Sequence, residues 1–138
     1  MRVVIDTQIF VRATLGSLLA AQILQLFKDD RFELFLSVDT YSEFLEVVYR
    51  DKFKKAQDMD FVDLLISILR DNSIFIETTK NIPLNSRDPK DNKFIELAFS
   101  ANVDYLVSDD KELLSLANDK NLENIHIISL IDFLQIFN

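Results

Sequence analysis

The chain has 138 residues, close to the size of one domain, and we expect a single domain over residues 1–138. Its 49% apolar and 28% charged residues are typical of a protein that buries a core. A single glycine excludes a glycine-rich phosphate loop, the absence of cysteine excludes disulfides and zinc-thiolate sites, and one histidine excludes any site that needs two. Acid is abundant, with 23 Asp and Glu against 15 Lys and Arg and a net charge of −8. Oxygen ligands are therefore the expected chemistry of an active site.

The same composition bears on compartment and partners. The apolar stretches are interrupted by charges, none approaches the ~18 residues of a membrane span, and the N-terminus has no signal-peptide pattern. We therefore expect a cytoplasmic protein that does not bind membranes. An acidic chain is poorly suited to coat a phosphate backbone, so a role with nucleic acid requires local basic patches, a bound metal ion or both.

Strand-like and helical segments alternate along the chain. Short apolar runs predict buried strands at residues 3–5, 32–36, 73–76, 105–107 and 125–128. Helical spacing occurs at residues 17–28, 40–50, 58–70, 89–101, 110–117 and about 130–137. The two helices after the second strand are the one break in the alternation. This order predicts an α/β domain with a central, mostly parallel sheet covered on both faces.

Acidic residues follow the predicted strands or begin the helices after them. In a parallel sheet of this kind, ligands bind beyond the carboxyl ends of the strands. The acids expected at that edge are Asp6, Asp39, Glu43, Asp88, Asp91, Asp109 and Asp110.

Helix capping alone explains each of these acids when it is taken singly, because helix N-termini favour acidic side chains. The segment from Thr40 to Glu43 is a capping-box pattern, in which Glu43 only holds the helix start. Asp88 precedes a proline, as a cap often does, and Asp109 with Glu112 fits a second box.

Helical spacing indicates that capping alone does not explain two of these acids, Asp91 and Asp110. Asp91 lies three, four and seven residues before apolar residues of its helix, and Asp110 shows the same offsets, so both project from a buried face. Asp6, which leaves the first strand, faces the same opening. Three carboxylates at one place repel one another unless a cation is bound, which predicts a metal site. Glu43 points almost opposite to the apolar stripe of its own helix.

Four segments together resemble PIN-domain ribonucleases in order and spacing: residues 3–7, Ser37 followed by Glu43, residues 87–91 and residues 105–110. The resemblance covers nearly the whole chain, including residues 47–53, and lies within the PIN proteins that act as toxins of type II toxin–antitoxin systems. It implies a three-layer α/β/α sandwich with a PIN-like fold. It also implies an acid cluster that holds one or two Mg²⁺ or Mn²⁺ ions, formed here by Asp6, Glu43, Asp91 and Asp110.

The resemblance implies a metal-dependent endoribonuclease that cleaves single-stranded or structured RNA, acts as a toxin, forms a homodimer and is silenced by a cognate antitoxin protein. Asp6 and Asp91 are the expected primary ligands. Auxiliary roles fall to Thr7, Gln8, Asp88, Ser108, Asp109 and Glu112. Basic residues near the acids, and a basic run with an aromatic residue, are candidate RNA contacts: Arg12, Arg50, Lys52, Lys54, Lys55, Arg87, Lys90 and Lys93.

Two other interpretations remain open. The chain has Gln8 where the family usually has asparagine, and Asp109 where it usually has glycine, which favours a catalytically impaired PIN fold that acts as a protein–protein interaction module. A response-regulator receiver also places acids around Mg²⁺. It requires an acidic pair after the first strand and a lysine after the last, where this chain has Asp6 with Thr7 and Ser129 with Leu130.

Overall fold

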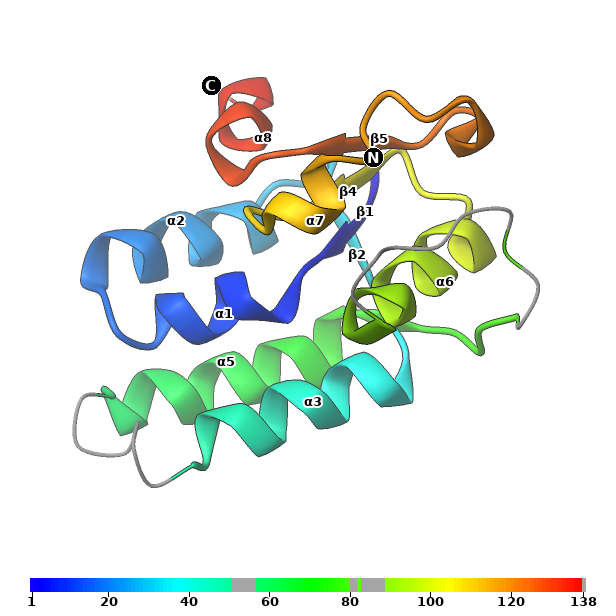
Figure 1. Ribbon diagram of the computed structural model, residues 1–138. Coiled ribbons are helices and arrows are strands. Elements are labelled where there is room, and N and C mark those ends of the chain that lie inside the picture. Colours follow the sequence, from blue (N-terminus) through cyan, green and yellow to red (C-terminus); the bar gives the residue numbers. More distant parts are fainter. Residues whose placement is uncertain (51–56, 80–81, 83–88, 138) are drawn as a thin grey trace.

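The computed structural model describes residues 1–50, 57–79, 82 and 89–137, and within these ranges five parallel strands form one sheet (Figure 1). The order across the sheet is β3-β2-β1-β4-β5, and every pairing is parallel. The strands are β1 (Arg2–Ile5), β2 (Glu33–Leu36), β3 (Ile74–Phe75), β4 (Tyr105–Val107) and β5 (His126–Ile128). The five predicted strands are confirmed, and β1 lies at the centre of the sheet.

The helices connect these strands in the order that the sequence predicted, with one addition. They are α1 (Thr7–Ala13), α2 (Ser17–Phe27), α3 (Val38–Val48), α5 (Met59–Asn72), α6 (Asn92–Ala101), α7 (Lys111–Leu114) and α8 (Leu130–Ile136). Short 3₁₀ turns, η1 (Pro89–Asp91) and η2 (Lys120–Leu122), precede α6 and β5. Helix α7 ends earlier than the predicted residue 117 because the following backbone makes tighter i→i+3 bonds, as from Leu116 N–H to the Leu113 carbonyl.

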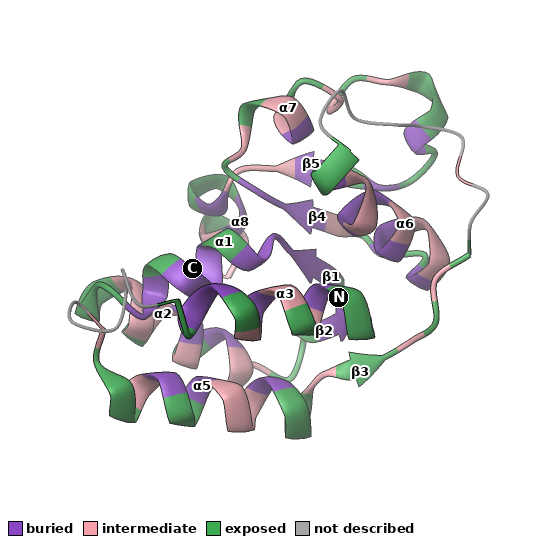
Figure 2. Cartoon of the chain, turned by 60° about the horizontal axis from the view of Figure 1, so that its bottom comes forward, coloured by how far each residue is buried: buried purple, intermediate pink, exposed green. Residues whose placement is uncertain are grey.

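Two apolar clusters lie on opposite faces of the sheet, because successive side chains of a strand point to opposite sides. Val3 and Ile5 pack with α1, α2, α3, α5 and α8, whereas Val4 packs with α6 and with the segments after β4. Figure 2 shows the central strands buried between these helices, while β3 at the edge is exposed. The result is the expected three-layer α/β/α arrangement.

Helix α1 was not predicted, and its presence means that the alternation is broken after β1 as well as after β2. Its segment contains β-branched and aromatic residues with weak helix propensity, and it is only seven residues long. Tertiary burial explains why it is helical: Ile9, Phe10, Val11 and Ala13 are all buried. The Asp6 side chain caps the helix by accepting from the Gln8 N–H.

The start of α3 corrects a second prediction. Ser37, not Thr40, is the N-cap, and α3 begins at Val38. The Ser37 hydroxyl accepts from the Thr40 N–H at 3.1 Å, while the Thr40 hydroxyl accepts from the Ser37 N–H at 3.0 Å. Two buried hydroxyl residues therefore form the capping box, and Glu43 has no part in it.

The strand order also decides against the receiver interpretation. Receivers of the flavodoxin-like type have the order 2-1-3-4-5, whereas the order here is 3-2-1-4-5. Among the described helices, none combines the length and the apolar character that crossing a membrane demands.

Candidate active site

The four predicted acids line one small pocket at the carboxyl-end edge of the sheet. This pocket, called the acid pocket below, has a volume of about 210 Å³. Its lining residues are Asp6, Gln8, Glu43, Lys90, Asp91, Phe94 and Asp110. Each of the four acids comes from a different part of the fold, so the sheet and helices bring together carboxylates that are far apart in the sequence.

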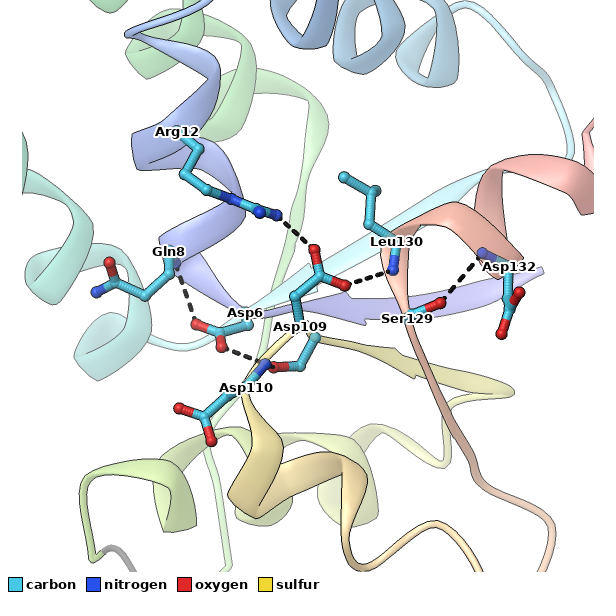
Figure 3. Close-up of polar contacts among 9 residues, drawn as sticks. Asp6, Gln8, Arg12, Asp109, Asp110, Ser129, Leu130 and Asp132 are labelled. Atoms are coloured by element: carbon cyan, nitrogen blue, oxygen red, sulfur yellow. Dashed lines mark hydrogen bonds and ion pairs between the residues drawn. The ribbon is translucent and has the colours of Figure 1, made fainter.

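Asp6 lies directly after β1 and is only 3% exposed. Its Oδ1 accepts from the Gln8 N–H at 3.1 Å and its Oδ2 accepts from the Ser108 hydroxyl at 2.8 Å (Figure 3). Burial raises the pKa of the Asp6 carboxyl above its ordinary value of 3.8, and the nearby charges of Asp110 and Glu43 raise it further, while these two hydrogen bonds oppose the rise. The surroundings of Asp6 therefore disfavour the charged form of its carboxyl.

Asp110 lies at the start of α7 and is half-buried. Its Oδ1 accepts from the Glu112 N–H at 2.7 Å, so Asp110 is the N-cap of this helix. The predicted capping box of Asp109 with Glu112 is therefore wrong by one residue. The Asp110 N–H donates to the Ser108 hydroxyl at 3.0 Å, and this serine, which is fully buried, links Asp110 to Asp6.

Glu43 is a half-buried residue of α3 and does not extend freely into solvent. Its Oε2 accepts from the Thr7 hydroxyl at 3.3 Å and lies 3.4 Å from the Lys93 Nζ. Thr7 is in the first turn of α1 and Lys93 is on α6. The isolated helical wheel of α3 did not show this position because both partners belong to other helices.

Asp91 closes the turn η1 and is 6% exposed. It occupies the N-cap position of α6 without a side-chain capping bond, which corrects its predicted place at the third position of a helix starting at Pro89. Phe94, three residues later, also lines the acid pocket. Helical spacing predicts Phe94 as part of the buried stripe of its helix, and its position three residues after Asp91 is the sequence signal that it also lies beside the pocket. Asp88 lies outside the described residues.

Asp109 makes its contacts away from the acid pocket. Its Oδ2 pairs with the Arg12 Nη2 at 2.6 Å, and its Oδ1 accepts from the Leu130 N–H at 3.0 Å. Figure 3 shows the carboxylates of Asp109 and Asp110 pointing to opposite sides of their loop. Asp109 therefore ties α1 and the start of α8 to the loop that carries Asp110. A second pocket, of about 220 Å³, lies beside this tie and is lined by Asp6, Gln8, Ile9, Arg12, Asp109 and Asp110.

Some of the predicted basic residues lie at the other side of the acid pocket. Arg50, Lys90 and Lys93 line a neighbouring pocket of about 390 Å³, together with Asp39, Ser42, Glu43 and Glu46. The remaining basic candidates, Lys52, Lys54, Lys55 and Arg87, lie outside the described residues. Of the auxiliary candidates, Glu112 contributes its backbone N–H to Asp110.

Comparison with known protein families identifies the family to which the chain belongs. A family model described as PIN domain matches residues 2–112, from β1 to the first residues of α7, and includes all four acids of the pocket. The chain belongs to the PIN domain family. A search of curated proteins gives no match. PIN domains are generally nucleases, and typically use divalent metal ions.

The oxygen donors of the acid pocket suit such an ion by their chemistry, as ligands that would leave several of its waters in place. Among the described residues, no group of three or more acidic or histidine side chains has a geometry that could hold a metal ion. Mg²⁺ usually keeps several waters and binds protein through one or two carboxylates, so such a group is not required. Carboxylate oxygens are suitable ligands for Mg²⁺ and Mn²⁺. Burial is the main cause of the raised pKa of Asp6, and the charges of Asp110 and Glu43 add to it, so a cation bound beside these carboxylates would oppose the rise.

Proposed function

We propose that this PIN domain protein is a metal-dependent endoribonuclease that cleaves single-stranded or structured RNA. The observation that carries the proposal is the convergence of Asp6, Glu43, Asp91 and Asp110 on one pocket of about 210 Å³. Carboxylates from four separate parts of the fold gain little from such proximity unless they share a cation, because their charges repel.

In this proposal the four acids hold one or two Mg²⁺ or Mn²⁺ ions, with Asp6 and Asp91 as the primary ligands. The bound metal would supply an activated water for in-line attack on a phosphodiester and would stabilise the leaving oxygen. Ser108 keeps the Asp6 carboxylate directed by donating to its Oδ2, and Thr7 donates to Glu43. Arg12, Arg50, Lys90 and Lys93, from the two neighbouring pockets, would contact RNA phosphates.

Cleavage of RNA by a matched pair of variants tests this function. Purified wild-type protein is incubated with several single-stranded and hairpin RNAs, with Mn²⁺ or with a chelator, beside the double variants Asp6→Asn/Asp91→Asn and Asp60→Asn/Asp63→Asn. Both double variants remove two negative charges, but Asp60 and Asp63 are exposed residues of α5. We expect Mn²⁺-dependent cleavage by the wild type and the α5 variant only. Cleavage that persists in the pocket variant would contradict the assignment of the acids.

The alternative is a PIN fold that has lost catalysis and serves as an interaction module. The observation in its favour is that no group of three or more acidic or histidine side chains among the described residues has a geometry that could hold a metal ion, together with the departures at Gln8 and Asp109. Lack of cleavage by the wild type across all RNAs, with no Mn²⁺ binding in calorimetry, would support this alternative.

Three further parts of the proposal rest on the resemblance to toxin–antitoxin proteins. They are a toxin role in the cytoplasm, a cognate antitoxin and a homodimer. Co-purification with the product of the neighbouring reading frame tests the antitoxin. Light scattering after size-exclusion chromatography tests the dimer, and a single monomeric peak would contradict it. Growth arrest on expression, relieved by the neighbouring frame, is the expected sign of the toxin role.

A further inference from the structure

A lysine side chain already provides positive charge to one of the pocket acids. The Lys93 Nζ lies 3.4 Å from the Glu43 Oε2, and the two side chains are 29% and 21% exposed. The same Glu43 oxygen accepts the Thr7 hydroxyl. An acid of the pocket is therefore engaged by a cation that belongs to the chain itself.

The position of Lys93 matters because of the charge it faces. Asp6 and Asp110 also line the acid pocket, and the charges of Asp110 and Glu43 both act on Asp6. An ammonium group beside Glu43 reduces this repulsion when no metal is present. A divalent cation bound to Glu43 would meet a like charge at 3.4 Å from the same carboxylate, and Lys93 would have to move away from it.

We propose that Lys93 is an internal counter-ion of the acid pocket, which competes with the divalent metal ion for Glu43 and so lowers the affinity of the pocket for that ion. This inference rests on the proposed metal-dependent function. The pair is suited to such competition because its contact is long, at 3.4 Å, and the partly exposed Lys93 side chain has a path to solvent when it leaves Glu43. The lysine ammonium is also a single charge on a flexible four-carbon stem, and can withdraw without moving α6.

Binding of Mn²⁺ to the whole chain, measured by calorimetry without RNA, tests the proposal. The variants are Lys93→Met, which removes the charge, Lys93→Arg, which keeps it, and Lys28→Met as a matched control. Lys28 is exposed and follows α2 before β2, at the opposite edge of the sheet. We expect Lys93→Met to bind Mn²⁺ roughly three- to tenfold more tightly than wild type, from the loss of one like charge. Lys93→Arg and Lys28→Met should stay close to wild type.

Other roles of Lys93 give different results, and each would overturn the proposal. If Lys93 only ties α6 to α3, Lys93→Met lowers the midpoint of thermal unfolding without metal and leaves the Mn²⁺ affinity unchanged. If Lys93 only contacts RNA phosphates, the same variant weakens RNA binding at unchanged Mn²⁺ affinity. Weaker Mn²⁺ binding by Lys93→Met would also contradict competition.

The variant Asp6→Asn/Asp91→Asn separates this proposal from the proposed function. Wild-type binding that is abolished in Asp6→Asn/Asp91→Asn but unchanged in Lys93→Met supports the metal pocket and overturns only the role of Lys93. Absence of Mn²⁺ binding from both wild type and Lys93→Met overturns both. Binding that is detected in Lys93→Met but not in wild type supports the competition directly.

Discussion

The two sides of the acid pocket hold their carboxylates in different ways. On the side of β1 and β4, Asp6 and Asp110 each accept from a backbone N–H, at 3.1 and 2.7 Å, and Ser108 connects them. On the side of α3, Glu43 is engaged by the side chains of Thr7 and Lys93 at 3.3 and 3.4 Å. One side is fixed by the backbone at two helix starts, whereas the other depends on longer contacts between side chains.

This difference shows what each side can do. A carboxylate that caps a helix keeps its direction whether or not a cation is present, because the backbone donors are part of the helix itself. Glu43 extends from the second turn of α3 and can change rotamer when its partners change. We therefore expect the β1/β4 side to define where the cation binds and the α3 side to adjust its affinity.

The largest expected effect is that of Asp6→Asn compared with Glu43→Gln. Loss of the fixed carboxylate should reduce RNA cleavage by more than about 100-fold, and loss of the adjustable one by about tenfold, on the scale of changes around metal ligands. Initial rates of cleavage with saturating Mn²⁺ measure both. Thermal unfolding provides the control: the asparagine oxygen can still accept from the Gln8 N–H and its amide can donate to the Ser108 hydroxyl, so Asp6→Asn should not lower the unfolding midpoint. Equal losses in the two variants would contradict the distinction between the sides.

The variant Ser108→Ala removes the hydroxyl that links Asp6 and Asp110 on the β1/β4 side of the pocket. The variant leaves the buried Asp6 Oδ2 without its donor and the partly buried Asp110 N–H without its acceptor. The free energy of unfolding should fall by about 1–3 kcal/mol, the cost of buried polar groups that lose their partners. Urea denaturation measures this, with Ser115→Ala as the control, since the exposed Ser115 hydroxyl only donates to the Glu112 carbonyl. A similar loss in both serine variants would mean that the link has no special role.

The sequence was sufficient to predict the parts of this arrangement that depend on local pattern. Five apolar runs gave the five strands, and the carboxyl ends of parallel strands necessarily share one edge. The strand pattern alone therefore predicts that Asp6, Asp91 and Asp110 lie near one another. Their spacing to apolar residues also indicates that Asp91 and Asp110 face inward, and in the structure Asp91 is buried and Asp110 is half-buried.

Features that depend on contacts between distant segments could not be read in the same way. Helix α1 has weak intrinsic propensity and is stabilised by burial, so its pattern was missed. The strand order predicts Glu43 at the same edge of the sheet, but only the family resemblance implied its place in the acid cluster, because its partners Thr7 and Lys93 are 36 and 50 residues away in the chain. Asp109 and Asp110 are adjacent in sequence, and only the turn before α7 decides which of them caps the helix.

The raised pKa of Asp6 predicts a smaller change, in the pH dependence of stability without metal. Since the folded pKa is above 3.8, the stabilisation that protonated Asp6 provides is complete below 3.8 and is lost as pH rises through the folded pKa. The free energy of unfolding of wild type relative to Asp6→Asn should therefore fall over this range and then level off. Chemical denaturation of both proteins in a pH series measures the difference, which isolates Asp6 from the other acids. A difference that rises with pH would contradict the raised pKa.

The smallest expected effect concerns the ion pair between Arg12 and Asp109, which lies beside the β1/β4 side of the pocket. Their side chains are 50% and 36% exposed, so the ion pair itself should contribute less than about 1 kcal/mol to the free energy of unfolding. Asp109→Asn removes the charge but keeps an oxygen for the Leu130 N–H, while Asp109→Ala removes both contacts. Asp109→Asn should therefore unfold nearly as wild type does, and Asp109→Ala should be less stable by about 1 kcal/mol, the usual net cost of a lost hydrogen bond. If Asp109 acts only through this tie, Mn²⁺ affinity stays unchanged in Asp109→Asn. A clear loss of affinity there would extend the fixed side of the pocket to a fifth carboxylate.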